Sequence, residues 1–340
     1  MAEVKEKIKQ QQNYSTLRLS EIRNRFKTMQ LILDRKDLCI YTTGSYGRLE
    51  AWEESDLDIF FINLNPKSIS KIDKTKIDSF IIDVCEKMGF PSFSNDGQYL
   101  EIHENKDIIN EIGSQTDDYR NFFTTRMLLL LESRPLINDD SYNKVLEEVV
   151  NRYYTDFNDH IKDFTPVFLV NDVMRFWRTM CLNYEHKRTR FVSDTEGLTE
   201  KQIEEKKVKI HLKNLKLKFS RKLTCFSFLI NLIWNNTGTI IPQEVLRISK
   251  LTPLNRLMDI LDKVSDEDVK SKLAILLQET IADYFWFLEK TQKPEKETLS
   301  WFAQKENRDE AFERSRGFSK KLFEIIKLSN NEKILTYFIF

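Results

Sequence analysis

The stretch "TTGSYGRLEAWEESDLDIFF", residues 42–61, decides how this chain is interpreted. Glycine is scarce, with 8 in 340 residues, yet Gly44 and Gly47 lie on either side of the dipeptide Ser45-Tyr46. Further along, Asp56 and Asp58 are separated by a single residue and lead directly into an apolar run. The stretch therefore combines a flexible polar turn with a pair of carboxylates at the start of a buried segment.

The turn around Gly44 has the composition of an anion-binding site. An apolar strand pattern precedes it, and the residues after it read as the start of a helix. Backbone N–H groups at a helix start, freed by glycine, can cradle a phosphate. Ser45 adds a hydroxyl donor and Arg48 a fixed positive charge, so the pattern predicts a phosphate site at Gly44, Ser45 and Arg48. In the alternative interpretation, Arg48 and Glu50 form a structural ion pair that fixes the turn.

The two aspartates are expected on one face of a strand at 57–63. Side chains alternate along a strand, so Asp56 and Asp58 share one face while Leu57 and Ile59 share the other. Carboxylates this close repel each other unless a cation lies between them or one takes a proton. Oxygen ligands suit Mg²⁺, which commonly uses one or two carboxylates together with substrate phosphates. A phosphate cradle beside such a pair predicts metal-assisted phosphoryl or nucleotidyl transfer.

The segment "GSYGRLE…SDLDIFFI" (44–62) resembles the active-site signature of the DNA polymerase beta-like nucleotidyltransferase superfamily. Its Gly-Arg-x-Glu variant, followed by SDLD, is similar to the bacterial PII-uridylyltransferase-like and signal-transduction nucleotidyltransferases. Downstream, "TTRMLLLLESRPLIND" (124–139) resembles the helix-plus-arginine segment that those proteins carry after the catalytic core. The resemblance does not extend to residues 140–340, and the regulatory and hydrolase motifs of the full uridylyltransferases are not recognised in the chain.

The resemblance implies a role for each residue of the signature. Gly44 and Ser45 would hold the β and γ phosphates of a nucleotide. Asp56 and Asp58 would bind two Mg²⁺ ions, with Mn²⁺ as an alternative metal. The implied fold is a small mixed sheet with helices.

A third carboxylate is often present on a later strand in this superfamily, where it binds the catalytic metal and helps to deprotonate the attacking hydroxyl. Glu101, in "YLEIHE" (99–104), is the candidate here, and Glu104 and Asp96 are its rivals. Tyr99 and His103 are expected to share its face of the strand. A glutamate on an exposed strand face is otherwise just a solvated residue. Without a third carboxylate, the chain would be a slow enzyme or a nucleotide-binding relic.

The segment "KKVKIHLKNLKLKFSRK" (206–222) contains eight Lys and Arg residues and no acid. Apolar residues recur through it at helical spacing and predict a buried stripe made of Leu212, Leu215, Phe219, Leu223 and Phe226. Such a run is usually a solvated face, and the alternative is that it meets triphosphate or an RNA or protein acceptor. In the resembled superfamily a helical domain commonly closes over the nucleotide, which makes the basic residues candidates for nucleotide binding: Lys213, Lys216, Lys218, Arg221 and Lys222.

The composition is that of a folded protein with balanced charge. Lys+Arg and Asp+Glu both number 53, which argues mildly against a chain built mainly to hold polynucleotide. The four cysteines form no C-x-x-C pair, so a zinc or redox motif is not expected. The charged N-terminus does not resemble a signal peptide, and the longest apolar run, Met127–Leu131, is too short for a membrane span. We therefore expect a cytoplasmic protein with no membrane partner.

The order of the patterns predicts an α+β protein of two domains. A nucleotidyltransferase domain with an N-terminal helix is expected at 1–138, and an all-helical domain that closes over nucleotide or substrate at 139–340. Strands are expected at 37–42, 57–63 and 97–104, and the segments 188–206 and 291–300 are expected to be a mobile loop and an exposed connection. Helices are expected at 15–35, 74–88, 119–132, 141–159, 168–186, 206–234, 243–262, 266–290 and 306–329.

The sequence thus predicts an Mg²⁺-dependent nucleotidyltransferase that moves NMP from an NTP to an acceptor and releases pyrophosphate. The acceptor class stays open between a protein, tRNA or another RNA, and a small nucleotide that would give a signalling product. The alternative is a regulatory module that binds nucleotide but has lost catalysis. The base of the NTP and the oligomeric state do not follow from the sequence.

Overall fold

The computed structural model describes residues 1–65, 69–93, 100–193, 197–235 and 238–337. The chain divides into two compact units. The N-terminal unit comprises Ala2–Pro166 and Gly238–Thr252, and the helical unit comprises Met1, Val167–Thr237 and Pro253–Phe340. A small four-stranded sheet lies in the first unit, and helices make up most of the rest, so the expected α+β class is confirmed at this level.

The division differs from the expected boundary after residue 138, because two later segments pack with the N-terminal unit. Helix α8 (Asp139–Arg152) lies against strand β1 (Leu38–Thr42), where Tyr142 and Tyr41 place their ring centroids 6.2 Å apart. Helix α12 (Pro242–Lys250) contacts α7 and α8 and buries Val245 completely. The helical pattern of these segments shows that they form helices but not which core their apolar faces join.

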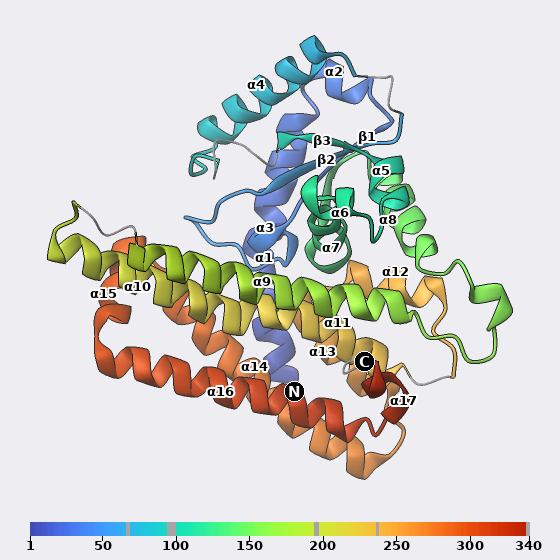
Figure 1. Ribbon diagram of the computed structural model, residues 1–340, viewed down its shortest axis with the longest axis vertical. Coiled ribbons are helices and arrows are strands. Elements are labelled where there is room, and N and C mark those ends of the chain that lie inside the picture. Colours follow the sequence, from blue (N-terminus) through green and yellow to red (C-terminus); the bar gives the residue numbers. More distant parts are fainter. Residues whose placement is uncertain (66–68, 94–99, 194–196, 236–237, 338–340) are drawn as a thin grey trace. The chain divides into compact units, whose positions relative to one another are not determined.

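The sheet of the N-terminal unit has the strand order β3-β2-β1-β4, and strands β1, β2 and β3 are labelled in Figure 1. Strand β1 pairs antiparallel with β2 (Ile59–Asn63) and with β4 (Arg134–Ile137), and β2 pairs parallel with β3 (Ile102–Glu104). Thr42 lies opposite Ile59, so the end of β1 and the start of β2 lie at the same edge of the sheet. The turn after β1 and the aspartates before β2 are therefore neighbours.

Both faces of the sheet are covered by helices. On one face, Ile40 and Phe61 join an apolar cluster with residues of α1 (Ala2–Phe26) and α4 (Lys71–Lys87). On the other face, His103 contacts Phe122 of α7, and Tyr41 contacts Tyr142 of α8. Burial on both faces explains why β1 and β2 read as continuous apolar runs. The remaining elements of this unit are α2 (Gln30–Leu33), α3 (Gly44–Gly47), α5 (Asn105–Asn110), α6 (Gln115–Tyr119), α7 (Phe122–Glu132) and a 3₁₀ turn at Phe157–Asp159.

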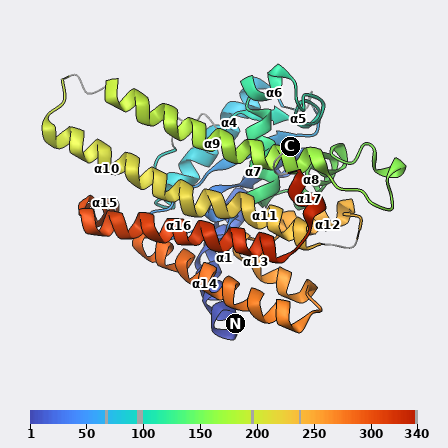
Figure 2. The same ribbon diagram turned by 60° about the horizontal axis from the view of Figure 1, so that its bottom comes forward.

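The helical unit is built from long helices that lie side by side (Figure 2). Helix α10 (Glu200–Lys216), the π-helical segment η3 (Leu217–Arg221) and α11 (Lys222–Trp234) follow one another without a break. Phe219 in η3 stacks on Phe287, with centroids 4.8 Å apart, and anchors the core of the unit. The other elements are α9 (Val167–Ser193), α13 (Pro253–Asp259), η4 (Ile260–Lys263), α14 (Glu267–Thr291), α15 (Glu295–Ala303), α16 (Lys305–Leu328) and α17 (Glu332–Thr336). None of the described helices is long and apolar enough to cross a membrane.

Three expectations about local structure are wrong. The loop expected at 188–206 is largely helical, because α9 continues to Ser193 and a capping box between Thr199 and Gln202 starts α10. The connection expected at 291–300 contains most of α15. The single helix expected at 243–262 is two helices, and Pro253 begins the second, where a missing N–H costs nothing.

Candidate active site

The chain leaves β1 through a turn that contains two glycines, Gly44 and Gly47. Thr43 is extended, and Gly44 then takes φ +65° before the single helical turn α3. A Cβ on Gly47 would lie 1.8 Å from the main-chain oxygen of Glu132, so a side chain there is sterically excluded. The N–H groups of Gly47 and Arg48 bond back to Thr43 and Gly44, which leaves the preceding N–H groups at the open start of the turn.

Asp58 lies directly against this turn. Its carbonyl oxygen accepts bonds from the N–H of Thr43 at 3.0 Å and from the hydroxyl of Thr42 at 2.8 Å. Its carboxylate borders Gly44 so closely that a Cβ on that residue would lie 2.6 Å from Oδ2. The structure thus brings together the glycine of the predicted phosphate turn and the second aspartate of the predicted metal pair.

Ser45 follows Gly44 in the same turn. The site formed by Gly44, Ser45 and Asp58 is called the corner from here on. Its Oγ atom is buried, and it has no hydrogen-bond partner within the described part of the chain. The main-chain oxygen of Ser45 accepts the N–H of Glu50 at 2.8 Å, which closes the turn. Leu49, just before that donor, takes φ +58°, a conformation that glycine usually occupies at the end of a helix. The residue that carries this hydroxyl therefore belongs to a turn whose backbone is hydrogen-bonded at both ends, at Thr43 and at Glu50.

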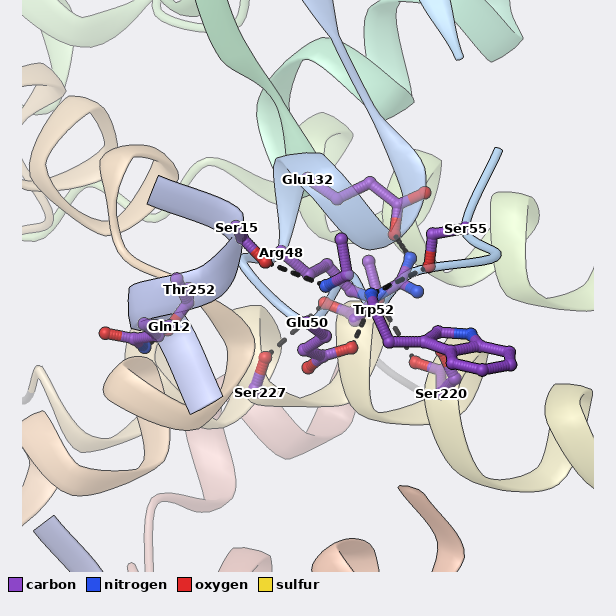
Figure 3. Close-up of polar contacts among 12 residues, drawn as sticks. Gln12, Ser15, Arg48, Glu50, Trp52, Ser55, Glu132, Ser220, Ser227 and Thr252 are labelled. Atoms are coloured by element: carbon purple, nitrogen blue, oxygen red, sulfur yellow. Dashed lines mark hydrogen bonds and ion pairs between the residues drawn. The ribbon is translucent and has the colours of Figure 1, made fainter. Parts of the chain in front are cut away.

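Asp56 is exposed, and it precedes β2 by three positions. The strand starts at Ile59 rather than at 57, so both aspartates lie in the segment that leads into it. The hydroxyl of Ser55 accepts the N–H of Trp52 at 3.0 Å, and the hydroxyl of Ser15 accepts the N–H of Ala51 at 2.8 Å (Figure 3). These two bonds fix the connection between the turn and the aspartates.

Glu101 directly precedes strand β3. In the parallel ladder the next residue, Ile102, pairs with Phe61 of β2. The exposed carboxylate of Glu101 pairs with Arg120 at 3.4 Å. Its role as the third carboxylate stays a prediction. Its rival Glu104 pairs with Lys106 at 3.0 Å.

Of the other residues considered with Glu101, the structure describes only some. Asp96 and Tyr99 lie outside the described residues. His103 is buried, and desolvation lowers its pKa below the ordinary value of 6.5, while the neighbouring Glu101 acts in the opposite direction. Among the residues that the structure describes, no three His, Cys, Asp or Glu side chains gather closely enough to hold a metal ion.

Arg48 is held by two carboxylates (Figure 3). Its Nε donates to Glu50 at 2.8 Å and its Nη1 donates to Glu132 at 2.6 Å. All three side chains are buried, with 8 % or less of their surface exposed. The structural pair with Glu50 that the sequence allowed is present, whereas a contact between Arg48 and phosphate stays a prediction. Glu132 was not anticipated, because it lies 84 positions along the chain and nothing in its local sequence signals a partner.

The basic residues proposed from the sequence belong to the helical unit. Lys213 and Lys216 are exposed on α10, and Arg221 lies at the end of η3. The predicted stripe beneath them is confirmed at Leu212, Leu215, Phe219 and Leu223, which are buried, while Phe226 is partly exposed. Nucleotide binding by the basic residues stays a prediction.

Lys218 and Lys222 complete the basic run. Burial and the nearby charge of Lys218 lower the pKa of Lys222. The ammonium of Lys222 donates to the hydroxyl of Ser319 and lies 5.4 Å from the ring centroid of Trp177. Lys222 is therefore integrated into the packing of the helical unit.

Comparisons with known proteins add no assignment. No protein-family model matches the chain, and no curated protein matches it significantly in sequence.

Proposed function

We propose that this protein is an Mg²⁺-dependent nucleotidyltransferase, which moves NMP from an NTP to an acceptor and releases pyrophosphate. The contact between Gly44 and the carboxylate of Asp58 carries the proposal. It joins the two halves of the signature at one edge of the sheet, although 13 residues separate them in the chain. The resemblance of residues 44–62 to the polymerase beta-like superfamily is consistent with this arrangement.

The residues at this corner fit a bound triphosphate. The N–H groups at the start of α3 are donors without an intrahelical acceptor, and Ser45 adds a buried hydroxyl that lacks a partner among the described residues. A buried polar atom of this kind is costly unless something bonds to it. In the proposed reaction these donors hold the pyrophosphate part of the nucleotide and stabilise the charge that develops on it.

The carboxylates fit a hard divalent cation. Asp56 is accessible to solvent and Asp58 borders the phosphate turn, so both carboxylates can supply oxygen ligands to a metal ion. A bound Mg²⁺ would neutralise phosphate charge and orient the α-phosphate for in-line attack. The chain's own contribution is positioning, since the carbonyl of Asp58 accepts hydrogen bonds from Thr42, the last residue of β1, and from Thr43.

The acceptor follows less directly from the site. Protein, tRNA or another RNA, and a small nucleotide all offer the hydroxyl that the reaction needs. The acid-free basic run at 206–222 favours a polyanionic acceptor or the triphosphate itself. The NTP substrate and the Mg²⁺ cofactor are both present in the cytoplasm, and we place the reaction there on that ground.

A second candidate function is a nucleotide-sensing module without turnover. The observation that favours it is that the carboxylate of Glu101 is exposed and pairs with Arg120. If Glu101 is the third carboxylate, Glu101→Gln should reduce turnover as strongly as Asp58→Asn. If Glu101→Gln leaves turnover unchanged, the two aspartates act without it.

The test is transfer of label from each α-³²P NTP with Mg²⁺, in the presence of total tRNA or of cell protein. The matched variant is Asp56→Ala/Asp58→Ala, and chelation of the metal is the second control. Label that moves to one acceptor class, and is lost in the variant, supports the transferase. Binding of Mg-NTP without transfer to any acceptor supports the sensor, and absence of both refutes the two proposals together.

A further inference from the structure

Glu132, the last residue of α7, contacts the phosphate turn in two ways. Its main-chain oxygen fills the space where a Cβ of Gly47 would lie, at 1.8 Å from that atom. Its side-chain Oε2 accepts a hydrogen bond from Nη1 of Arg48 at 2.6 Å. One residue of α7 thus contacts two consecutive residues of the turn, through the main chain and through the side chain.

We propose that Glu132 is a positioning residue, which acts through Arg48 to hold the Gly44–Gly47 turn in the conformation that receives the phosphates. The inference rests on the transferase function proposed above. The Nε of Arg48 also donates to Oε2 of Glu50 at 2.8 Å. Rotation of the guanidinium would therefore break a charge-assisted hydrogen bond to Glu132 or to Glu50. The side chain of Arg48 therefore ties the turn to Glu132 at the end of α7.

The turn needs such a restraint because it contains a strained residue. Leu49 takes φ +58°, which disfavours a side chain with a Cβ, and it directly follows Arg48. Strained backbone persists only where the surrounding structure over-determines it, and it concentrates at functional sites. The bonds of Arg48 to Glu132 and Glu50 supply that over-determination on both sides of Leu49.

The end of α7, which carries Glu132, is firmly packed. Leu129 and Leu130 of α7 are completely buried, and the hydroxyl of Ser133, next to Glu132, bonds to the carbonyl of Leu129 and to the hydroxyl of Tyr142. A buried ion pair contributes little net stability compared with apolar packing, so conformational specificity is the better account of this one. We therefore assign its role to the shape of the turn rather than to the stability of the unit.

The test compares Glu132→Ala and Glu132→Gln with a matched buried pair elsewhere in the same unit. Asp117 and Arg126 form that pair, with two bonds of 2.9 Å and fully buried side chains, and Arg126 also donates to Ile108 and Tyr153. Asp117→Asn is the control for general destabilisation. Steady-state kinetics for the NTP and amide hydrogen exchange at residues 43–50 are measured on all variants that are folded by circular dichroism.

Glu132→Ala is expected to raise KM for the NTP by about tenfold or more, with a smaller change in kcat, because ground-state phosphate binding is disturbed. Glu132→Gln should recover part of the loss, since its amide oxygen can still accept the bond from Arg48. Both variants should exchange faster at residues 43–50, whereas Asp117→Asn should lower Tm without either effect.

Unchanged exchange at residues 43–50 in both Glu132 variants would overturn the inference, and so would an equal rise in KM for Asp117→Asn. If the wild-type protein transfers no label, the proposed function fails on its own. The exchange experiment then still decides whether Glu132 holds the turn.

Discussion

Replacing Gly44 with alanine should damage the site more than the fold. At φ +65° a residue with a Cβ costs about 1–2 kcal/mol relative to glycine. The new Cβ would lie 2.6 Å from Oδ2 of Asp58, so the carboxylate has to turn away. Because that atom ends a flexible side chain, it adds little to the folding cost. We expect Tm to fall by roughly 2–8 °C, as domains of 150–250 residues lose about 2–4 °C per kcal/mol.

Gly47→Ala is the matched comparison, and it should damage the fold more than the site. Its Cβ would lie 1.8 Å from the oxygen and 2.8 Å from the carbon of the Glu132 carbonyl. Both are main-chain atoms at the end of a buried helix, so the backbone itself must move. Overpacking usually costs about 1–3 kcal/mol and here should reach or exceed the upper end of that range.

The two variants are compared by urea unfolding and by Mg-NTP binding and pyrophosphate release per folded molecule. Gly44→Ala should keep most of its stability and lose binding and turnover, because the Asp58 carboxylate is displaced. The reasoning is refuted if Gly44→Ala is as active per folded molecule as the wild type. It is also refuted if Gly47→Ala is the less destabilised of the two.

Three further predictions concern Asp58, Arg48 and His103. Asp58→Asn should stay folded, because its main-chain bonds to β1 remain, but should release pyrophosphate at least about 100-fold more slowly; a wild-type rate would contradict the metal role. Arg48→Met leaves two buried glutamates without their guanidinium and should cost about 3–5 kcal/mol in urea unfolding, whereas a loss below about 1 kcal/mol would show that the two glutamates do not need the guanidinium to stay buried. Burial lowers the pKa of His103, so just below pH 6.5 the unfolded state binds a proton at this residue more readily than the folded state does. Stability should therefore fall as pH drops through 6.5, and Tm measured against pH should show a smaller fall in His103→Phe; equal slopes would exclude His103 as the cause.

Local sequence patterns predict most of the elements but not how they associate. The strands at 37–42 and 57–63 and the helix at 74–88 lie within a few residues of β1, β2 and α4. Strand β4 was missed because Arg134 and Pro135 interrupt its apolar pattern, and its pairing with β1 depends on residues far away in the sequence. The return of α12 to the N-terminal unit is likewise a tertiary event without a local signal.

The candidate site divides in the same way. The neighbourhood of Gly44 and Asp58 could be predicted because both lie at the ends of adjacent antiparallel strands, which local patterns reveal. The partners of Arg48 could be predicted only in part. Glu50 is two positions away and was anticipated, whereas Glu132 reaches the turn through the packing of α7.

The pairing of Arg48 changes how a triphosphate would be held at this corner. A guanidinium that already bonds to two carboxylates carries little positive charge toward a third anion, so the turn offers mainly neutral N–H and O–H donors. Neutral donors orient phosphates but compensate their charge poorly. Under the proposed function, the compensation would come from divalent cations held by Asp56 and Asp58. Nucleotide affinity at this site should accordingly depend on the divalent ion more steeply than on any side chain of the turn itself.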